Sequence, residues 1–249
     1  MPKKLISSLI ISVLMLISVC IIYHYYYSSS PKKPNVPVLV YHSISNDIFS
    51  RNISLFVNPK DFENQIKWIV KNKYTTIFAD KISDIQKYKK PVIITFDDGY
   101  EDNYNIVFPL VKKYNIKITI FVVTDGIGAE KKLTPNQIIE MYDSGLVSFQ
   151  SHTKSHPNLL KINSQQLDIE LRESRDKLFY LLNEYPTVIA YPFGKANATI
   201  VNSVKKYYSC GYSLLTRNIS YTDDEYMIRR FGIGRYTTIN DIKKYLDNV

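Results

Sequence analysis

The feature that most constrains the fold is an alternation, from Val36 onward, of short apolar runs with segments of helical period. Seven runs are predicted to be strands: Val36–Tyr41, Thr75–Phe78, Val92–Phe96, Ile116–Val123, Leu146–Phe149, Val188–Tyr191 and Tyr212–Thr216. Several are apolar almost throughout, as parallel strands buried on both faces are. Repeated strand–helix units predict an α/β fold with a parallel sheet, and seven or eight units suit a barrel better than a short open sheet.

Helix signals lie between these runs. Asn58 followed by proline is typical of an N-cap with proline at the first helical position. Thr134, with Gln137 three residues later, opens a second helix that is predicted to end before Gly145. Leucines at helical spacing mark a third helix, at Leu167, Leu171, Leu178 and Leu182.

Two polar clusters follow predicted strands. Asp97 and Asp98 come directly after the third run, and His152 and His156 follow the fifth. Taken singly, the first cluster also fits an ordinary turn and the second a pair of surface histidines. Parallel barrels place their chemistry at the C-terminal ends of their strands, so we expect all four side chains at one end of the barrel.

These residue types suit metal-assisted hydrolysis. Asp98, His152 and His156 would supply three ligands and leave one position open, as in catalytic metal sites. An ion with an open position can activate water and polarise a carbonyl. Asp97 would stay ionised at neutral pH and accept the proton of the attacking water. We predict one divalent ion, Zn²⁺ first, with Co²⁺, Ni²⁺ or Fe²⁺ as alternatives that suit the same ligands.

The clusters resemble motifs of the polysaccharide deacetylase family, also called NodB-homology or carbohydrate esterase family 4 proteins. The first motif is matched by Thr95–Gly99, the second by Ser151–Pro157 and the third by Ala190–Gly194. Weaker similarity extends from Pro37 to about Thr216. The resemblance implies a distorted (β/α) barrel, over residues 36–249, that removes acetyl groups from N-acetylglucosamine residues of a polysaccharide.

The resemblance also implies roles by position. Asp97 would be the base, and the three residues named as ligands would hold the metal. Tyr191, Pro192, Phe193 and Gly194 would line the sugar groove, and a backbone N–H there would help the metal to stabilise the oxyanion. The alternative for this segment is a plain strand end followed by a turn.

One departure concerns the catalytic acid. Many family members take it from a C-terminal Leu-x-His motif, yet no histidine follows His156 here. Amide cleavage needs a proton for the departing amine. His42 follows the first predicted strand, and similar Tyr-His segments occur in members resembling poly-N-acetylglucosamine deacetylases, where that histidine is the acid. We predict that His42 is the acid; a buried, hydrogen-bonded histidine is the alternative.

The N-terminal segment Leu5–Ile22 is uncharged and mostly apolar. As a helix it would measure about 27 Å, close to the roughly 30 Å hydrocarbon core of a bilayer. We predict that residues 1–35 are a membrane anchor and linker that hold the catalytic domain outside the cytoplasm. A signal peptide, cleaved to release a secreted domain, is the competing interpretation.

Composition narrows the remaining classes. The formal net charge of +9 favours anionic surroundings such as a cell envelope, although scattered surface lysines are also ordinary. No basic run with interleaved aromatics suggests nucleic-acid binding, and nothing points to a protein partner. Cys20 lies in the apolar N-terminal segment, so Cys210 has no disulfide partner within the domain.

The leading prediction is a membrane-anchored, metal-dependent deacetylase of an envelope or extracellular polysaccharide. A carbohydrate-binding protein that keeps the fold without turnover is the alternative, motivated by the missing C-terminal histidine. Hydrolysis of another ester or amide is a third possibility. The polymer stays open, because peptidoglycan, poly-N-acetylglucosamine and chitin-like oligomers carry the same acetamido group.

Overall fold

The computed structural model describes residues 15–23, 36–46, 53–214 and 224–247. The chain divides into two compact units, Met1–Pro34 and Asn35–Val249. In the first unit the described residues, 15–23, are helical. Within the described ranges, no helix combines the length and the apolar character that a membrane span requires. The larger part of the predicted anchor Leu5–Ile22 lies outside the described residues.

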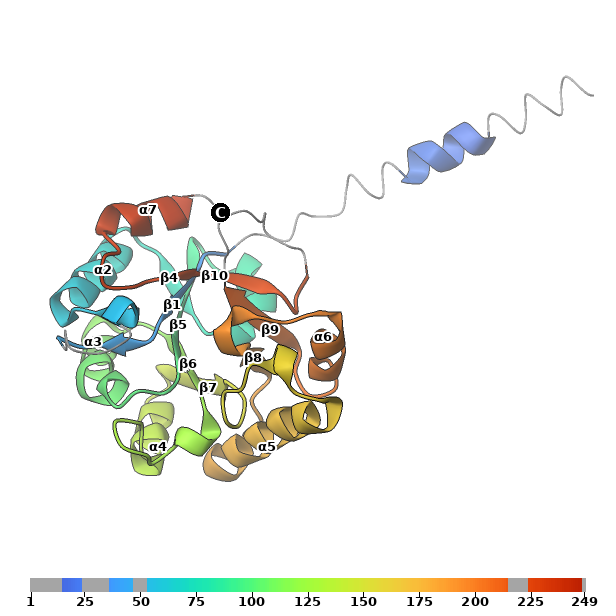
Figure 1. Cartoon of the computed structure of the whole chain (residues 1–249). Helices are drawn as coiled ribbons and strands as arrows, with labels where there is room; N and C mark the ends of the chain where they lie inside the picture. The colour runs from blue at the N-terminus through green and yellow to red at the C-terminus, as the bar shows by residue number, and fades with distance from the viewer. Residues whose placement is uncertain (1–14, 24–35, 47–52, 215–223, 248–249) are drawn as a thin grey trace, which may run out of the picture. The chain divides into compact units, whose positions relative to one another are not determined.

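The second unit is a parallel β-barrel surrounded by helices (Figure 1). Its ring of seven strands comprises β1 (Val38–Tyr41), β5 (Pro91–Asp97), β6 (Ile118–Val122), β7 (Val147–Ser151), β8 (Val188–Ala190), β9 (Cys210–Leu214) and β10 (Ile228–Gly232). The ring closes because β1 pairs in parallel with both β10 and β5. A further strand, β4 (Thr75–Ile77), pairs with the beginning of β5. The short strands β2 (Ser43–Ile44) and β3 (Phe56–Val57) form a separate parallel pair.

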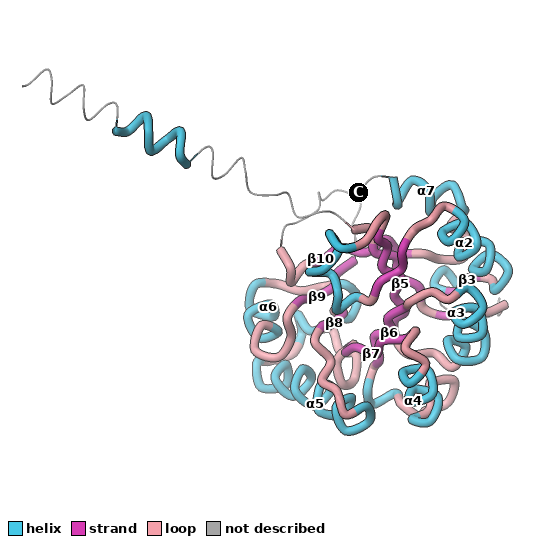
Figure 2. Tube along the Cα trace, turned by 180° about the vertical axis from the view of Figure 1, so that it is seen from behind, coloured by secondary structure: helices cyan, strands magenta, loops and turns pink. Residues whose placement is uncertain are grey.

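Six α-helices are described in the second unit, and they lie around the strands, as the view from behind also shows (Figure 2). They are α2 (Pro59–Lys71), α3 (Phe108–Tyr114), α4 (Pro135–Asp143), α5 (Ser164–Leu182), α6 (Ala198–Val204) and α7 (Ile239–Asp247). Helical segments of 3₁₀ or, at η3, π type are η1 (Ile53–Leu55), η2 (Ala79–Lys87), η3 (Asn103–Val107), η4 (Thr124–Gly126), η5 (Leu159–Lys161) and η6 (Pro192–Gly194).

The predicted helix starts are confirmed. The Asn58 side chain accepts a hydrogen bond from the backbone N–H of Lys60 at the start of α2. Thr134 and Gln137 form a reciprocal capping box at the start of α4, so two backbone donors that would otherwise lack partners are satisfied. In α5 the predicted leucine stripe is buried at three of its four positions and partly buried at Leu182.

Burial along the strands follows the two-residue period of a pleated chain. Ile93 belongs to an apolar cluster that joins strand residues of the barrel, including Val38 and Phe121, to residues of η2. Its neighbours Val92 and Ile94 instead join the larger cluster beneath the helices. Because alternate side chains point to opposite faces, the first cluster fills the barrel interior and the second packs the helices onto its outside.

The α/β barrel prediction is confirmed, with one strand of the ring, β10, and the short pair β2 and β3 missed. Each of the seven predicted strands overlaps a strand of the structure. β10 was absent from the prediction because Arg229 and Arg230 interrupt its apolar pattern. Arg230 is nevertheless fully buried, because its side chain finds a charged partner inside the barrel.

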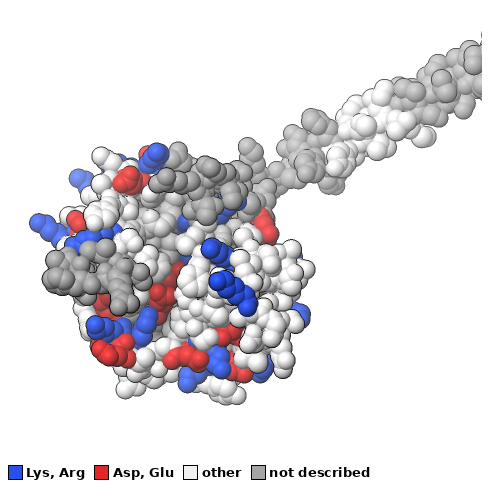
Figure 3. All heavy atoms as spheres, in the orientation of Figure 1, with Lys and Arg blue, Asp and Glu red and all other residues white. Residues whose placement is uncertain are grey.

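The distribution of charged side chains favours the interpretation that the lysines are scattered surface residues. Lys and Arg side chains are interspersed with acidic ones over the face drawn in Figure 3 and do not gather into a single patch. A mixed distribution of this kind is typical of a solvated protein surface.

Candidate active site

The polar residues singled out in the sequence lie at the C-terminal ends of barrel strands. Asp97 is the last residue of β5 and Asp98 follows it. His152 comes directly after β7, and His42 comes directly after β1. Since neighbouring parallel strands end at the same rim, the fold gathers side chains that are far apart in the sequence.

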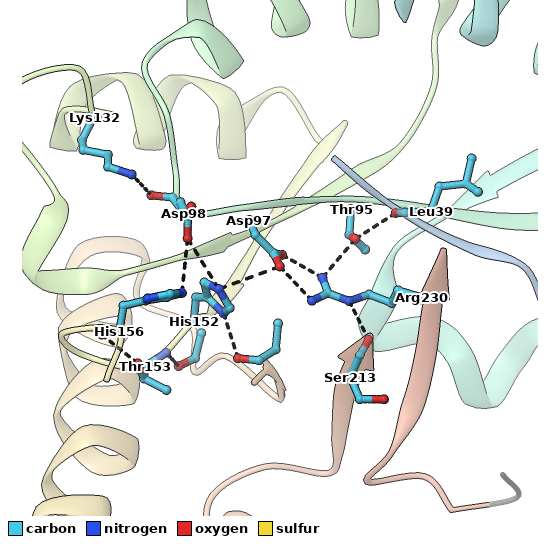
Figure 4. A network of polar contacts seen from close by, with 12 residues as sticks. Leu39, Thr95, Asp97, Asp98, Lys132, His152, Thr153, His156, Ser213 and Arg230 are labelled. Carbon is cyan, nitrogen blue, oxygen red and sulfur yellow. Dashed lines mark hydrogen bonds and ion pairs between the residues drawn. The ribbon is translucent and has the colours of Figure 1, made fainter. Parts of the chain in front are cut away.

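Asp98, His152 and His156 converge on one point (Figure 4). The Nε2 atoms of His152 and His156 lie 3.5 Å and 3.6 Å from Oδ1 of Asp98. One ligand atom from each residue lies within 4.8 Å of the others. Three atoms about 2.1 Å from a tetrahedral metal would be about 3.4 Å apart, so the spacing fits a divalent ion. The donor set of two imidazoles and a carboxylate also suits one.

A hydrogen bond at Nδ1 of His152 leaves Nε2 of the same ring available to bind a metal. Nδ1 lies 2.8 Å from the carbonyl oxygen of Ala190 and donates to it, which leaves the lone pair of Nε2 facing Asp98. Burial lowers the pKa of His152, although the nearby charges of Asp97 and Asp98 oppose the shift. The neutral ring, which is the form that binds metals, is therefore favoured.

The loop that carries the two histidines has an unusual backbone. Thr153 and His156 both have positive φ, at 66° and 61°, and Asp98 has a φ of 72°. The Thr153 hydroxyl oxygen accepts a hydrogen bond from the backbone N–H of His156 at 3.1 Å. Non-glycine residues adopt this region only where surrounding contacts compensate for it, and such residues cluster at functional sites.

Asp97 is held by a residue that the sequence analysis missed. Arg230, in β10, donates from its two terminal nitrogens to the two carboxylate oxygens of Asp97, at 2.7 Å and 2.8 Å (Figure 4). It also donates to the Thr95 hydroxyl and to the carbonyl oxygen of Ser213. Burial would raise the pKa of Asp97, but the Arg230 charge, supported by His152, outweighs it and lowers that pKa to about 2. The carboxylate is therefore ionised at neutral pH and fixed in direction.

His42 lies at the same rim, held by its backbone. Its carbonyl oxygen accepts a hydrogen bond from Asn103 Nδ2 at 3.0 Å. The next two residues are tied to Asp102, which accepts from the Ser43 hydroxyl and, at 3.1 Å, from the N–H of Ile44. The buried ring atom Nδ1 of His42 has no hydrogen-bond partner among the described residues. A positive charge on the His42 ring would contribute to lowering the pKa of Asp97.

The predicted groove segment needs a correction. Tyr191 is fully buried and donates from its hydroxyl to the carbonyl oxygen of Tyr226 at 2.8 Å, so its side chain supports the core and does not line a groove. Pro192 is also buried, and a Cβ at Gly194 would meet Leu214 at 2.6 Å. Phe193 is the member of the segment whose side chain is exposed.

Phe193 stands beside the proposed metal ligands. Its side chain is 54% exposed, and its ring meets that of His156 edge-on at a centroid distance of 4.8 Å. Its φ of 59° again lies in the left-handed region. The ring therefore offers an apolar face at the edge of the site, where a sugar ring could pack.

Two further residues beside Asp98 carried no signal in the sequence. Lys132 donates to the carbonyl oxygen of Asp98 at 3.1 Å, and its ammonium lies 3.7 Å from the centre of the Tyr100 ring. Burial lowers the pKa of Lys132. Burial and then the Asp98 charge raise the pKa of Tyr100 to about 12, so its hydroxyl stays protonated.

A closed parallel barrel with a carboxylate and two imidazoles converging at its strand ends fits the NodB-homology class that the sequence motifs resemble. The chain belongs to the polysaccharide deacetylase family: the model of that family matches residues 84–212, just over half of the 249 residues. The resemblance noted in the sequence is thereby confirmed.

Known proteins similar to this chain bear related names. YxkH of Bacillus subtilis, named as a polysaccharide deacetylase, is 37% identical over 180 residues, covering 70% of this chain and 62% of YxkH. The poly-β-1,6-N-acetyl-D-glucosamine N-deacetylase of Staphylococcus aureus strain MRSA252 is 28% identical over 232 residues, covering 82% of this chain and 80% of that protein. The chain thus spans less than two thirds of YxkH.

A solved structure shares the fold. The Streptococcus pyogenes deacetylase PplD, in complex with acetate, aligns with a TM-score of 0.77 and 29% identity, over 85% of this chain and 97% of PplD.

Proposed function

We propose that this protein is a metal-dependent N-deacetylase that releases acetate from N-acetylglucosamine residues of a cell-envelope or extracellular polysaccharide. The observation that carries the proposal is the convergence of Asp98, His152 and His156 beside Asp97, a carboxylate held ionised by a buried arginine. The name of the Staphylococcus aureus relative supports the choice of an N-acetylglucosamine polymer.

Asp98, His152 and His156 would hold the ion. A divalent ion bound there supplies an activated water and polarises the acetamide carbonyl. We favour Zn²⁺, and the same donors also suit Co²⁺, Ni²⁺ and Fe²⁺.

Asp97 acts as the general base. The attacking water gives a proton to the Asp97 carboxylate while its oxygen bonds to the carbonyl carbon. A carboxylate with a pKa of about 2 is by itself a weak base. Its main contribution is therefore that it is ionised and held in a fixed direction towards the attacking water. Arg230 fixes that aim through its two parallel hydrogen bonds.

His42 acts as the general acid in place of a C-terminal histidine. When the carbon–nitrogen bond breaks, the ring donates a proton to the departing sugar nitrogen, which leaves as an amine, and acetate is the second product. Its uncommitted Nδ1 and its place directly after β1, at the same rim as Asp97, support this role. Phe193 would pack against the sugar ring.

We also propose that the segment 5–22 anchors the protein in a membrane, with the barrel outside the cytoplasm. Support comes from its uncharged, apolar sequence and from the polymers on which the proposed reaction acts. Alkaline carbonate extraction should leave the full chain in the membrane pellet, and protease added to intact cells stripped of wall should digest the barrel. Release of a shortened chain into the medium would instead indicate cleavage.

Acetate release tests the catalytic proposal. The full chain, treated with chelator and then supplied with a single metal, should release acetate from N-acetylglucosamine oligomers or from peptidoglycan, and Asp97→Asn should abolish that release. Metal binding without acetate from any polymer would contradict the proposal and favour a carbohydrate-binding protein. Release from simple esters alone would favour hydrolysis of another substrate class.

A further inference from the structure

Outside the ligands themselves, a buried carboxylate on α5 contacts the loop that carries them. Glu170 is only 8% exposed, and it lies on the buried stripe of α5 beside Leu167 and Leu171. A charge among leucines needs strong hydrogen bonds to be stable there. The hydrogen-bond donors to Glu170 show which part of the molecule it supports.

All three hydrogen bonds to Glu170 come from the loop between the two metal-site histidines. One carboxylate oxygen accepts from the backbone N–H groups of Lys154 and Ser155, at 2.9 Å and 2.8 Å. The other oxygen accepts from the Ser155 hydroxyl at 2.5 Å. Two successive N–H groups aimed at one anion form a nest, and hydrogen bonds to an ionised acceptor are stronger than neutral ones.

The loop depends on such contacts for its shape. Thr153 and His156, on either side of the two residues that Glu170 holds, both have positive φ. The loop is also tied to η4, where the N–H groups of Thr124 and Asp125 donate to the carbonyl oxygens of Thr153 and Lys154. Glu170 therefore attaches the middle of this loop to α5, directly before His156.

We propose that Glu170 is a positioning residue for the metal site: it holds the 153–155 backbone so that His156 Nε2 meets Asp98 at ligand spacing. This inference rests on the proposed metal site, but not on turnover. Removing Glu170 leaves all three ligands in the chain and removes the support of one of them. Groups that orient metal ligands typically contribute about 10–100-fold to metal affinity.

A matched control lies one turn away on the same helix. Glu173 also contacts the loop, but through the ammonium of the half-buried Lys154, at 2.8 Å, and not through the backbone. Its side chain is 40% exposed. Exposed ion pairs contribute little, so Glu173→Gln should leave the loop in place.

The test is metal affinity of the full chain, measured by titrating Zn²⁺ and by following the visible absorption of bound Co²⁺. We expect Glu170→Ala to raise the metal Kd about 10–100-fold and to alter the Co²⁺ spectrum, whereas Glu173→Gln should match the wild type. Glu170→Gln keeps one oxygen acceptor and should lie between the two. If Glu170→Ala does not fold, Glu170→Gln is the deciding variant.

The outcomes separate the two proposals. An unchanged Kd in Glu170→Gln and Glu170→Ala, even with lower thermal stability of the metal-free protein, would overturn the positioning role and leave a structural one. Weakened binding in a chain that releases no acetate would support the positioning role and count against the proposed deacetylase. A wild-type chain that binds neither ion would overturn both.

Discussion

His152 and His42 occupy equivalent places in the barrel, yet their surroundings differ. Each follows directly after the last residue of a strand, β7 or β1. The ring of His152 is buried and fixed through Nδ1, whereas the ring of His42 keeps a buried Nδ1 without a partner in the described part of the chain. At His42 it is the backbone that is held, by Asn103 and, through the next residues, by Asp102.

The difference matches two kinds of task. A metal ligand must present the same lone pair at all times, and a fixed tautomer ensures that. A proton donor must change its protonation state during each turnover, and a ring with an uncommitted nitrogen can do so without breaking an internal hydrogen bond. Equivalent positions in a repeated fold can thus diverge through the hydrogen bond made by one ring nitrogen.

The largest effect that would distinguish the two rings is on metal binding. His152→Ala removes a buried ligand, so saturable Zn²⁺ binding should be lost by calorimetry. Acetate release should fall by more than about 10³-fold, beyond the loss typical of a single oxyanion donor. A His152→Ala protein that binds Zn²⁺ as the wild type does would show that His152 is not a metal ligand.

The next effect concerns His42 and depends on the leaving group. His42→Ala should keep the metal affinity of the wild type and lose about 10²-fold in amide deacetylation, the lower range for a general acid. 4-Nitrophenyl acetate has a leaving group that needs no proton, so hydrolysis of that ester should fall much less. Equal losses on the amide and the ester would show that His42 is not the acid.

The third effect concerns Asp97, which lies 3.8 Å from Nε2 of His152, and its buried partner Arg230. Arg230→Gln leaves a buried carboxylate uncompensated, and urea unfolding at pH 7 should show a loss of about 3–5 kcal/mol. The pKa of Asp97 should rise from about 2 because burial is then unopposed, and the acid limb of the rate profile should move to higher pH.

The stability difference also has a defined pH dependence. The folded pKa of Asp97 lies below its unfolded value of about 3.9, so the pair stabilises the fold fully above that value. The stabilisation declines as pH falls through the folded value of about 2. The unfolded states of the two proteins titrate alike, so the gap between wild type and Arg230→Gln should narrow as pH falls from the raised pKa of Asp97 in the variant towards the wild-type value of about 2. Arg172, in exposed ion pairs, provides the control: Arg172→Gln should change stability by less than about 1 kcal/mol.

The smallest effect tests whether the backbone contacts matter to His42. Asp102→Ala leaves the N–H of Ile44 and the Ser43 hydroxyl without their acceptor, which should cost about 1–3 kcal/mol in unfolding free energy. Amide deacetylation should decline and Zn²⁺ affinity should not. Asp102→Asn retains one acceptor oxygen and should restore part of both losses. Zn²⁺ binding weakened by Asp102→Ala would contradict the separation of the two regions.

The barrel was predictable from sequence because its strands are buried on both faces and therefore show nearly continuous apolar runs. The strand that escaped, β10, carries Arg229 and Arg230. An arginine becomes compatible with a barrel interior only when a carboxylate faces it, and Asp97 is 133 positions away in the chain. A prediction that scores each segment separately does not include this long-range pairing.

The site was predictable where motif spacing carried it, at Asp98, His152 and His156. It was not predictable where burial decides. Tyr191 appears in a motif that suggested a groove, but its ring is in the core. Glu170 left a weak signal, a charge within a helical stripe of leucines, whose meaning required the loop it contacts.

The closure of the ring has a consequence for the order in which this protein can assemble. β1 pairs with β10, and Arg230 in β10 reaches Asp97 in β5, so the cation of the buried pair comes from the strand translated last in the ring. Contacts between such distant parts of a chain carry a loop-closure cost and form slowly. A nascent chain without β10 would lack the cation that compensates the Asp97 carboxylate, the proposed base. The barrel closes and the charge of Asp97, the proposed base, is compensated in the same event.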